Sequence, residues 1–356
     1  MKKILFAAKD LNIGGIETAL ISLVNELVKE YKVTVVLEKA EGTLFEDLDK
    51  NVKVMEYNPS ECKIKIIRKI INMFKRIKFT VMLKNKYDFA AAYATYSKMA
   101  SFVARTASKN NALWGHSTYG LLYKDDDKMR DFFRGLNYDK FKHIIFAASD
   151  SKDDFIKVMK YEKDNIIFCN NLINYRRILK LSNEYEVEKD KRYTFLTVAR
   201  HEEHSKKFTR LIEAAKMLKE EGLEFKVNMV GDGPETDMYR KLVKENNLND
   251  NFVFLGRKQN PYPYFKSSDC LILTSEYEAF PVVCVEAMIL KTPIITTNIA
   301  DVQEIVAGKF GKVVEKDTNE IYIAMKENIL NGFEITDTFD PEQFNKNIIN
   351  KLKNIM

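Results

Sequence analysis

Short runs of apolar residues alternate with amphipathic stretches along almost the whole chain, and this alternation limits the fold more than any other feature of the sequence. Residues 16–30, for example, carry apolar side chains at the spacing of one helix face. Strands that alternate with helices predict parallel sheets that are covered by helices on both faces. In the first half, the runs that we expect to form strands are 2–8, 33–38, 52–56, 88–93, 111–115, 143–148 and 165–169.

The alternation is interrupted once, by a polar and charged stretch near 172–192, and then restarts. A chain of 356 residues also exceeds the size at which one hydrophobic core usually divides into two. We therefore predict an α/β protein with two Rossmann-like, doubly wound domains, over residues 1–172 and 190–335. In the second half, the expected strands lie in "YTFLTVAR", "FKVNMVGDG", "NFVFLGR", "DCLILTSE" and "PIITTN".

The charge of the chain is unevenly distributed. Residues 1–180 contain 33 Lys and Arg against 22 Asp and Glu, whereas residues 181–356 contain 24 against 29, and the net charge is +6. A basic half joined to an acidic half suggests different partners for each, and we expect no nucleic acid among them. No apolar run approaches the roughly 18 residues of a membrane-spanning helix. The four cysteines lie far apart, which argues against a zinc site or a disulfide framework and suits the cytoplasm.

Ligands of doubly wound sheets bind beyond the carboxyl ends of the strands, so the loops after the strands hold the candidate residues. After the first strand, Gly14 and Gly15 precede Glu17, which opens a helix. Glycines let backbone N–H groups approach a ligand, and a helix N-terminus attracts anions. The same pattern also forms plain strand-to-helix turns, and that interpretation stays open. The G-x-G-x-x-G motif of dinucleotide-binding proteins is absent.

Two cations follow the first strand of the second half. Arg200 comes directly after "FLTVA", and Lys206 follows six residues later, just before the helical "FTRLIEAAKML". Two cations at a strand end that faces a cleft could hold a diphosphate through charge-assisted hydrogen bonds. Ordinary surface side chains are the alternative interpretation.

Two acidic residues, Glu278 and Glu286, form the sharpest pair. Pro281 suits an early helical position, so we expect a helix over 282–290, with Glu278 in the loop ahead of it and Glu286 one to two turns inside. Carboxylates accept hydrogen bonds from vicinal hydroxyls of a ribose or a hexose. Backbone amides around Ala279 and Phe280 would point at whatever fills the cleft.

A glycosidase would also use two carboxylates, and that alternative was weighed against the spacing of the pair. Glycosidases need their carboxyl groups about 5 to 9.5 Å apart. Eight residues of helix separate two side chains by about 12 Å. The loop that contains the proline could shorten this distance, so the spacing favours a binding pair without excluding a glycosidase.

His116 lies at the carboxyl end of the apolar run "NALWG". A lone histidine is more often structural, but the position at a strand end in the basic half makes this one a candidate for the pocket. The three aspartates at 125–127 resemble a D-x-D metal motif, but no strand precedes them. We read them as the solvated start of a helix and predict no metal site.

These segments together give the chain a resemblance to the family-4 retaining glycosyltransferases, particularly bacterial enzymes that build capsule or surface polysaccharides. The resemblance covers nearly the whole chain. Its most specific part is "SEYEAFPVVCVEAM", which looks like the E-x7-E segment of the family, with Glu278 and Glu286 as its acids. Ala279 and Lys207 stand where the family usually has glycine. Further similar segments are "GGIE", "WGHS", "VAR", "LIEA", "MVGDGPE", "NPYPYFKSSDCLILTS" and "PIITTNIADVQEIV".

The resemblance implies a GT-B fold, with an acceptor-binding N-domain, a C-domain that binds the nucleotide-sugar, and a helix within 336–356 that returns to the N-domain. It implies that Arg200 and Lys206, or Lys207 in place of Lys206, neutralise the donor diphosphate without a metal. Glu286 would hold the ribose hydroxyls. The implied catalytic residues are His116, which lines the reacting face, and Glu278, which binds the transferred sugar. The implied donor-binding residues are Gly14, Gly15, Arg200, Lys206, Ala279, Phe280, Pro281, Val282 and Glu286.

The activity that this implies is transfer of a hexose or N-acetylhexosamine, with retention of anomeric configuration, from a nucleotide-sugar. We expect a UDP-sugar, no further cofactor, and a growing surface glycan or lipid-linked oligosaccharide as acceptor, in the cytoplasm or at the inner membrane face. Two alternatives remain. A nucleotide-sugar 2-epimerase would lack the E-x7-E segment in this setting. A non-catalytic partner subunit would not need the complete set of cations and acids.

Residues 63–86 form the last feature of note, with nine Lys or Arg and no acidic residue. A basic amphipathic helix of this kind can lie on an anionic bilayer. Alternatively, its apolar stripe is buried against the sheet and its cations merely face water. The apolar residues at helical spacing are Ile64, Ile67, Ile70, Ile71, Phe74, Ile77 and Val81.

Overall fold

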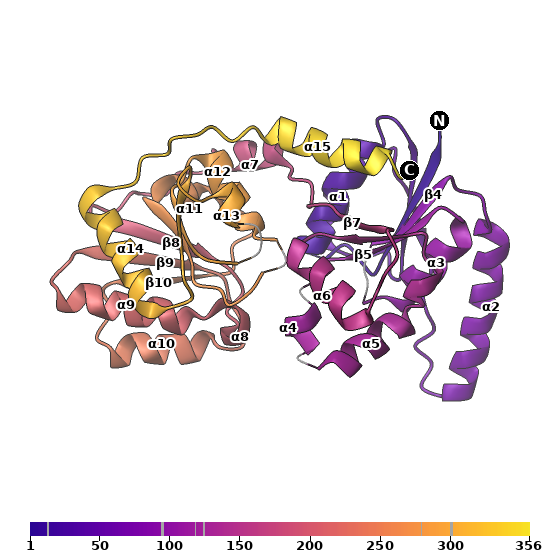
Figure 1. The fold of residues 1–356 in the computed structure, drawn as a ribbon, viewed down its shortest axis with the longest axis horizontal. Helices are drawn as coiled ribbons and strands as arrows, with labels where there is room; N and C mark the ends of the chain where they lie inside the picture. Colours follow the sequence, from indigo (N-terminus) through magenta and orange to yellow (C-terminus); the bar gives the residue numbers. More distant parts are fainter. Residues whose placement is uncertain (13, 94–95, 118, 124, 279, 300–301) are drawn as a thin grey trace. The chain divides into compact units, whose positions relative to one another are not determined.

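The computed structural model describes residues 1–12, 14–93, 96–117, 119–123, 125–278, 280–299 and 302–356. The chain divides into two compact units, each built on its own parallel sheet. Unit 1 contains Met1–Ile173 together with Asn345–Met356, and unit 2 contains Asn174–Phe344. Figure 1 shows the course of the chain through both units.

Unit 1 has a seven-stranded sheet in the order β3-β2-β1-β4-β5-β6-β7, and every neighbouring pair of strands is parallel. All seven strands that the sequence predicted for this half form, each within two residues of its expected ends. Consecutive residues of β1 and β4 are buried, which means that both faces of the sheet are covered. The strands are β1 (Lys3–Ala8), β2 (Lys32–Leu37), β3 (Lys53–Glu56), β4 (Phe89–Ala92), β5 (Asn111–Gly115), β6 (His143–Phe146) and β7 (Ile166–Phe168).

Helices connect these strands, and two short 3₁₀ turns, η1 (Thr43–Asp47) and η2 (Tyr138–Lys140), add to them. The aspartates at 125–127 begin a helix, as predicted, because the Asp125 carboxylate accepts hydrogen bonds from the amides of Asp127 and Lys128. The helices are α1 (Gly15–Leu27), α2 (Lys65–Leu83), α3 (Lys98–Ala107), α4 (Tyr119–Tyr123), α5 (Asp126–Gly135) and α6 (Ser149–Met159).

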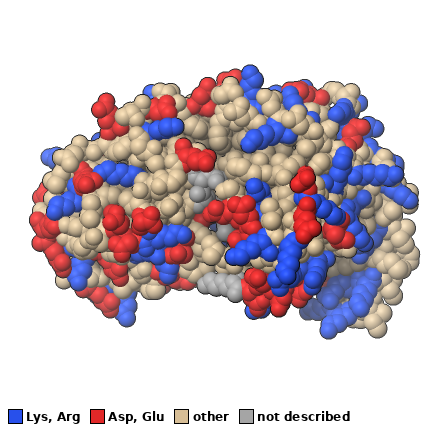
Figure 2. All heavy atoms as spheres, viewed as in Figure 1, with Lys and Arg blue, Asp and Glu red and all other residues tan. Residues whose placement is uncertain are grey.

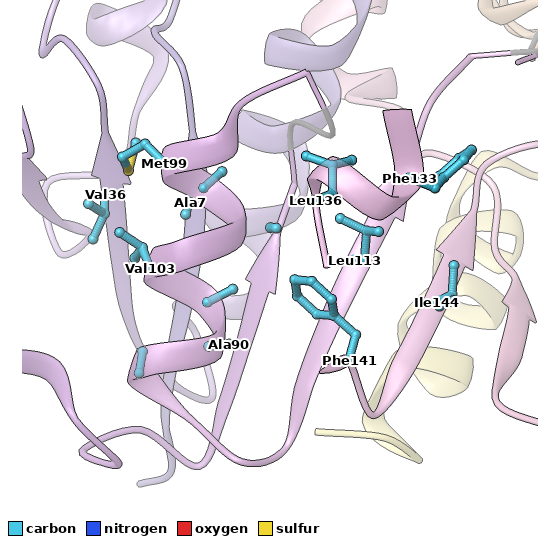
Figure 3. Packing of buried hydrophobic residues seen from close by; sticks show 14 of the residues in the cluster. Ala7, Val36, Ala90, Met99, Val103, Leu113, Phe133, Leu136, Phe141 and Ile144 are labelled. Carbon is cyan, nitrogen blue, oxygen red and sulfur yellow. The ribbon is translucent and has the colours of Figure 1, made fainter. Parts of the chain in front are cut away.

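One hydrophobic core of unit 1 lies between the sheet and the layer of helices that contains α3 and α5 (Figure 3). Small side chains on the central strands, such as Ala7 and Ala90, leave room for α3 to approach the sheet. Larger side chains fill the space over β5 and β6. The residues labelled in Figure 3 are Ala7, Val36, Ala90, Met99, Val103, Leu113, Phe133, Leu136, Phe141 and Ile144.

Unit 2 has a six-stranded parallel sheet in the order β10-β9-β8-β11-β12-β13. The five strands that the sequence predicted for this half are present. The edge strand β13 was not predicted, because a short segment interrupted by Lys312 carries little apolar signal. The strands are β8 (Tyr193–Val198), β9 (Phe225–Val230), β10 (Phe252–Gly256), β11 (Cys270–Leu273), β12 (Ile294–Thr297) and β13 (Gly311–Val314).

The polar stretch near 172–192 is not a featureless linker. It contains the helix α7 (Tyr175–Leu181), whose Asn174 side chain caps the amide of Arg177. The buried Ile178 anchors this helix, although charged neighbours hide the pattern in the sequence. The remaining helices of unit 2 are α8 (Glu203–Lys206), α9 (Phe208–Glu220), α10 (Thr236–Glu245), α11 (Tyr262–Ser267), α12 (Val282–Leu290), α13 (Val302–Ile305) and α14 (Thr318–Asn331).

The final helix, α15 (Pro341–Lys353), begins in unit 2, and from Asn345 onward it belongs to unit 1. The Asn345 side chain bonds both the amide and the carbonyl of Ile173, at 3.0 and 2.7 Å. Near the end of the chain, the Lys353 ammonium lies 2.7 Å from the Glu30 carboxylate, and Lys2 donates to the carbonyl of Met356 at 2.8 Å. Unit 1 is therefore completed by the last twelve residues of the chain.

Candidate functional site

Most of the predicted site residues gather in unit 2, where β8 and β11 end. These two strands are neighbours in the sheet and run in the same direction, so the loops after them lie at one edge. Arg200 and Lys206 follow β8, and Glu278 follows β11. The sequence separates Lys206 from Glu278 by seventy-two positions, and the topology of the sheet brings them together.

Lys206 and Glu278 form an ion pair between the Lys206 ammonium and Oε1 of Glu278. The same oxygen accepts a hydrogen bond from the Ser275 hydroxyl at 2.9 Å. Both charged side chains are only 18% exposed, so solvent screens the pair less than it would a surface pair. The Lys206 ammonium and the Glu278 carboxylate therefore lie side by side at the edge of the sheet where β8 and β11 end.

Backbone contacts fix the loop after β11 against α8. The Thr274 hydroxyl lies 3.0 Å from the carbonyl of Lys206, and the amide of Glu276 donates to the carbonyl of Ser205 at 2.7 Å. Lys206 is therefore positioned by both loops.

Lys207 has a different role from its neighbour. Its backbone adopts the left-handed conformation, with φ of 50°, between α8 and α9. Glycine takes this conformation without strain, which explains physically why glycine suits the position. The Lys207 ammonium lies 3.7 Å from Glu203, whereas Lys206 reaches Glu278. The geometry thus favours Lys206 over Lys207 as the cation that acts in the site.

Arg200 is held less firmly than Lys206. Its side chain is 68% exposed, and its guanidinium lies 3.0 Å from the Glu202 carboxylate. The backbone around it is supported by the loop after β9, where a Cβ on Gly233 would meet the carbonyl oxygen of His201 at 2.2 Å. The "GDG" of the sequence thus serves close packing of two loops, and an exposed Arg200 remains available to a ligand.

Glu286 lies on the second turn of α12 and faces two residues that the sequence did not single out. The Tyr262 hydroxyl donates to Oε1 of Glu286 at 3.0 Å, and Arg177 is close enough to act on it electrostatically. Glu286 keeps some exposed surface, yet protein surrounds the carboxyl group so closely that burial raises the pKa of Glu286 to about 7. The Tyr262 hydroxyl and the charge of Arg177 act in the opposite direction.

The segment between the two acids shows one correction. Pro281 was expected to be an early helical residue, but it stands just before the helix as the N-cap, and Val282 is the first residue of α12. The missing amide hydrogen of proline costs nothing at either position. The Phe280 ring is buried and stacks on Phe344, with ring centroids 6.3 Å apart. Ala279, also predicted to bind the donor, lies outside the described residues.

In unit 1, His116 lies at the carboxyl end of β5, as predicted, and its side chain is buried. The imidazole packs against Tyr93 and Trp114, with ring centroids at 4.4 and 6.0 Å. Burial lowers the pKa of His116 to about 3, against smaller opposite effects of Tyr93 and Asn171. Neither ring nitrogen has a hydrogen-bond partner of good geometry among the residues described. His116 is thus a neutral imidazole near pH 7.

Gly14 and Gly15 also belong to unit 1, at the start of α1. Gly14 is the N-cap of that helix and has no side-chain cap. A Cβ on Gly14 would meet the Glu17 carboxylate at 2.3 Å, whereas a Cβ on Gly15 would meet no described atom within 4 Å. The Glu17 carboxylate accepts a hydrogen bond from the Tyr96 hydroxyl at 2.7 Å. Gly15 therefore presents open backbone at a helix N-terminus.

Sequence reasoning missed Tyr262, Ser275 and Arg177. Tyr262 precedes β11 by eight residues and matches no pattern of charge or glycine. Arg177 lies in the polar and charged stretch near 172–192, where no site was expected. Ser275 directly follows "CLILT" and could have been found by listing every polar residue after a predicted strand. Across the residues that the structure describes, no three His, Cys, Asp or Glu side chains are grouped to hold a metal ion.

Known proteins resemble this chain in sequence and in fold. Residues 181–354, which include all the site residues of unit 2 from Arg200 to Glu286, match the family model of the glycosyl transferases group 1. Residues 181–354 are a group 1 glycosyl transferase domain. With 27% identity, 44% of this chain matches 39% of an uncharacterized glycosyltransferase of Methanocaldococcus jannaschii.

Two known proteins match nearly the whole of this chain. An α-1,4-N-acetyl-D-galactosaminyltransferase of Campylobacter jejuni, which acts on a diphospho-undecaprenol-linked glycan, is 24% identical over 99% of this chain and 93% of its own. The structure of Anabaena HepE in complex with UDP-glucose superposes with a TM-score of 0.75, at 18% identity, over 99% of this chain and 100% of that chain. The two parallel sheets are thus those of a GT-B fold, as predicted.

Proposed function

We propose that this glycosyltransferase transfers a hexose or N-acetylhexosamine from a UDP-sugar to a growing surface glycan or a lipid-linked oligosaccharide, with retention of anomeric configuration and without a metal. The observation that carries the proposal is the Lys206–Glu278 pair at the carboxyl ends of β8 and β11. It supplies, side by side, a cation suited to a diphosphate and an acid suited to sugar hydroxyls.

The diphosphate is the part of the donor that needs positive charge. Lys206 is placed by the contacts of Thr274 and pairs with a carboxylate that a phosphate can replace. Arg200, with its exposed guanidinium, supplies a second cation. Charge-assisted bonds of this kind stabilise the leaving nucleoside diphosphate as the glycosidic bond breaks. In unit 1, Gly15 would be a donor-binding residue, because its backbone is open at the start of α1.

The nucleoside and the sugar would be held by the two acids. Glu286, oriented by Tyr262, accepts hydrogen bonds from the two ribose hydroxyls. Glu278, released from Lys206 when the diphosphate binds, accepts from hydroxyls of the transferred sugar. The Phe280 amide precedes α12, which has no side-chain cap, and we propose that it donates to the same ligand. The Val282 amide instead donates to the Phe280 carbonyl at 2.8 Å, so Val282 would contact the donor through other atoms.

His116 would line the reacting face in unit 1. Because the imidazole is neutral, it can exchange a hydrogen bond with a sugar hydroxyl but adds no positive charge to an oxocarbenium-like transition state. A cation at this position would oppose the charge that develops on the sugar. The buried, uncharged state of His116 therefore suits sugar transfer through such a transition state.

Relatives support the choice of donor and acceptor. HepE binds UDP-glucose in its structure, and the C. jejuni relative transfers N-acetylgalactosamine to a lipid-linked glycan.

A donor screen tests the proposal. Thermal shift with UDP-glucose, UDP-N-acetylglucosamine and UDP-N-acetylgalactosamine, compared with GDP-, ADP- and CMP-sugars, should show stabilisation by a UDP-sugar. The same donor should then release UDP slowly in the absence of acceptor. Stabilisation by another nucleotide would overturn the donor assignment. Binding without any UDP release would favour a non-catalytic partner subunit, and interconversion of the sugar at C2 would favour an epimerase.

Metal independence is a further expected result. Since Lys206 and Arg200 supply the charge that a metal would otherwise bring, EDTA should leave UDP release within about twofold of its value in buffer alone. The measurement is the initial rate of UDP release with and without chelator. Loss of activity in EDTA that magnesium or manganese restores would contradict the assignment of the two cations.

A further inference from the structure

Helix α2 (Lys65–Leu83) leaves its apolar stripe uncovered. Its only buried residues are Phe79 and Leu83. Phe79 packs on Tyr57 with ring centroids 4.8 Å apart, and the Arg76 guanidinium lies over the Phe102 ring at 4.6 Å. These contacts hold one side of the helix against unit 1 beside α3 (Figure 1).

The opposite side of α2 is strongly apolar and exposed. Ile66 and Val81 are each 71% exposed, and Phe74 is 62% exposed. At about 100° of rotation per residue, seven of the eight exposed apolar residues of α2 fall in one arc of about 120°, on the far side of the helix from Phe79 and Leu83, and Met82 is the one that lies outside it. We name this arc the apolar face of α2, and it consists of Ile66, Ile67, Ile70, Met73, Phe74, Ile77 and Val81.

Cations flank the apolar face. With the same rotation of about 100° per residue, Lys69 lies at one edge of the apolar face and Lys78 at the other, and both side chains are exposed. Residues 63–86 carry nine Lys or Arg and no acid. Figure 2 shows blue side chains gathered at the lower right, in the part of unit 1 where Figure 1 places α2. Long basic side chains beside an apolar stripe can reach headgroup phosphates while the stripe enters the acyl region.

We propose that α2 docks unit 1 on an anionic lipid bilayer, lying in the plane of the interface. The sequence left open whether the apolar stripe of α2 is buried against the sheet or faces a bilayer, and the exposure of these side chains excludes burial against the sheet. A second copy of this chain is a poor occupant, because two faces flanked by so many like charges repel each other. Among the described residues, no helix combines the length and the apolar character needed to cross a bilayer. Resting on the proposed function, docking would bring the site to a lipid-linked acceptor.

The test uses the full chain and sedimentation with vesicles. Wild type should bind vesicles of phosphatidylcholine mixed with phosphatidylglycerol at about 50 mM salt, and much less at about 500 mM salt or with phosphatidylcholine alone. Changing Lys69 and Lys78, the two cations that flank the apolar face, to Gln should lower partitioning by roughly 25-fold, since each cation near the surface contributes about fivefold. Lys65 and Arg68 project to the side of Phe79 and Leu83 and are left intact. Lys75 and Arg76 are left intact because they contact the body of unit 1.

The matched control changes Lys244 and Lys291 of unit 2 to Gln, which removes the same charge from exposed positions. It should bind vesicles like wild type. Changing Ile70, Phe74 and Ile77 to Ser should also abolish binding while UDP release without acceptor stays unchanged. That rate separates failure of docking from failure of the proposed function. Three results would overturn the proposal. Wild type could stay in solution at low salt, or the control could lose as much vesicle binding as the test variant. The Ser variant could also merely convert a dimer to a monomer.

Discussion

Replacing Lys206 with alanine is expected to weaken UDP binding by roughly tenfold to more than a hundredfold, because a hydrogen bond to a charged group contributes about 1.5 to 3 kcal/mol. The ammonium is half-buried and positioned by two loops, so little of this contribution is lost to screening or to side-chain disorder. Arg200→Ala should lie at the small end of the range, because its guanidinium is largely exposed. Isothermal titration calorimetry with UDP measures both effects.

Lys207→Ala provides the matched control for this experiment. It removes the same charge one position away, from a side chain that faces Glu203 rather than Glu278. UDP affinity in this variant should remain within about twofold of wild type. A Lys207 variant that loses as much affinity as the Lys206 variant would show that general positive charge, and not the paired ammonium, binds the diphosphate. Thermal unfolding of each variant identifies any loss that comes from removing the Lys206 partner of Glu278.

Glu286→Gln is expected to stabilise the folded protein at alkaline pH while it weakens UDP binding. Burial holds the pKa of Glu286 at about 7, above its ordinary value of 4.5. The folded state therefore takes up the proton more readily than the unfolded state, and the contribution of this group to the free energy of unfolding is full below pH 4.5. It is lost as the pH rises through about 7, and the loss is on the order of 3 kcal/mol.

The difference between wild type and Glu286→Gln isolates this effect, because every other titrating group is common to both proteins. Denaturant unfolding should give similar stabilities near pH 5 and a more stable Gln variant at pH 8. Affinity should respond in the opposite sense, since ionised Glu286 is the better acceptor for ribose hydroxyls, so wild-type UDP binding should weaken below pH 7. A difference in stability that does not change with pH would contradict the raised pKa.

Glu278→Gln is the companion control for the nucleotide. Its carboxylate pairs with Lys206 in the ligand-free protein, so neutralising it frees the ammonium for phosphate. UDP affinity should be unchanged or higher, whereas UDP release from the UDP-sugar should fall. Equal loss of UDP affinity in both glutamate variants would contradict the separate roles of the two acids.

The fold was largely predictable because both sheets are parallel and buried on two faces, so most strands appear as continuous apolar runs. The exceptions have physical causes. The strand β13 is short and at an edge, and Lys312 interrupts its apolar pattern. Charged neighbours surround the single buried residue of α7, Ile178. In both cases, burial is decided by packing across the sheet, which local sequence does not encode.

The site was predictable as a set of loops but not as a set of contacts. Strand order explains why Lys206 and Glu278 belong to one edge, but their pairing depends on the turn at Lys207, where a left-handed residue ends α8. Tyr262 of α11 bonds Glu286 of the next helix, α12, and no rule of sequence spacing predicts this contact. The periodicity of α2 gives the same pattern whether its stripe faces a core or the outside. Only the packing of Phe79 and Leu83 distinguishes the two.

The last turn of α15 brings the two ends of the polypeptide together, since Lys2 bonds the carbonyl of Met356. A circular permutant that joins these ends and opens between Phe344 and Asn345 would encode unit 1 as one uninterrupted stretch of chain. A fragment that stops at Ile173 would instead lack α15 and expose the surface of unit 1 that Ile348 and Leu352 cover.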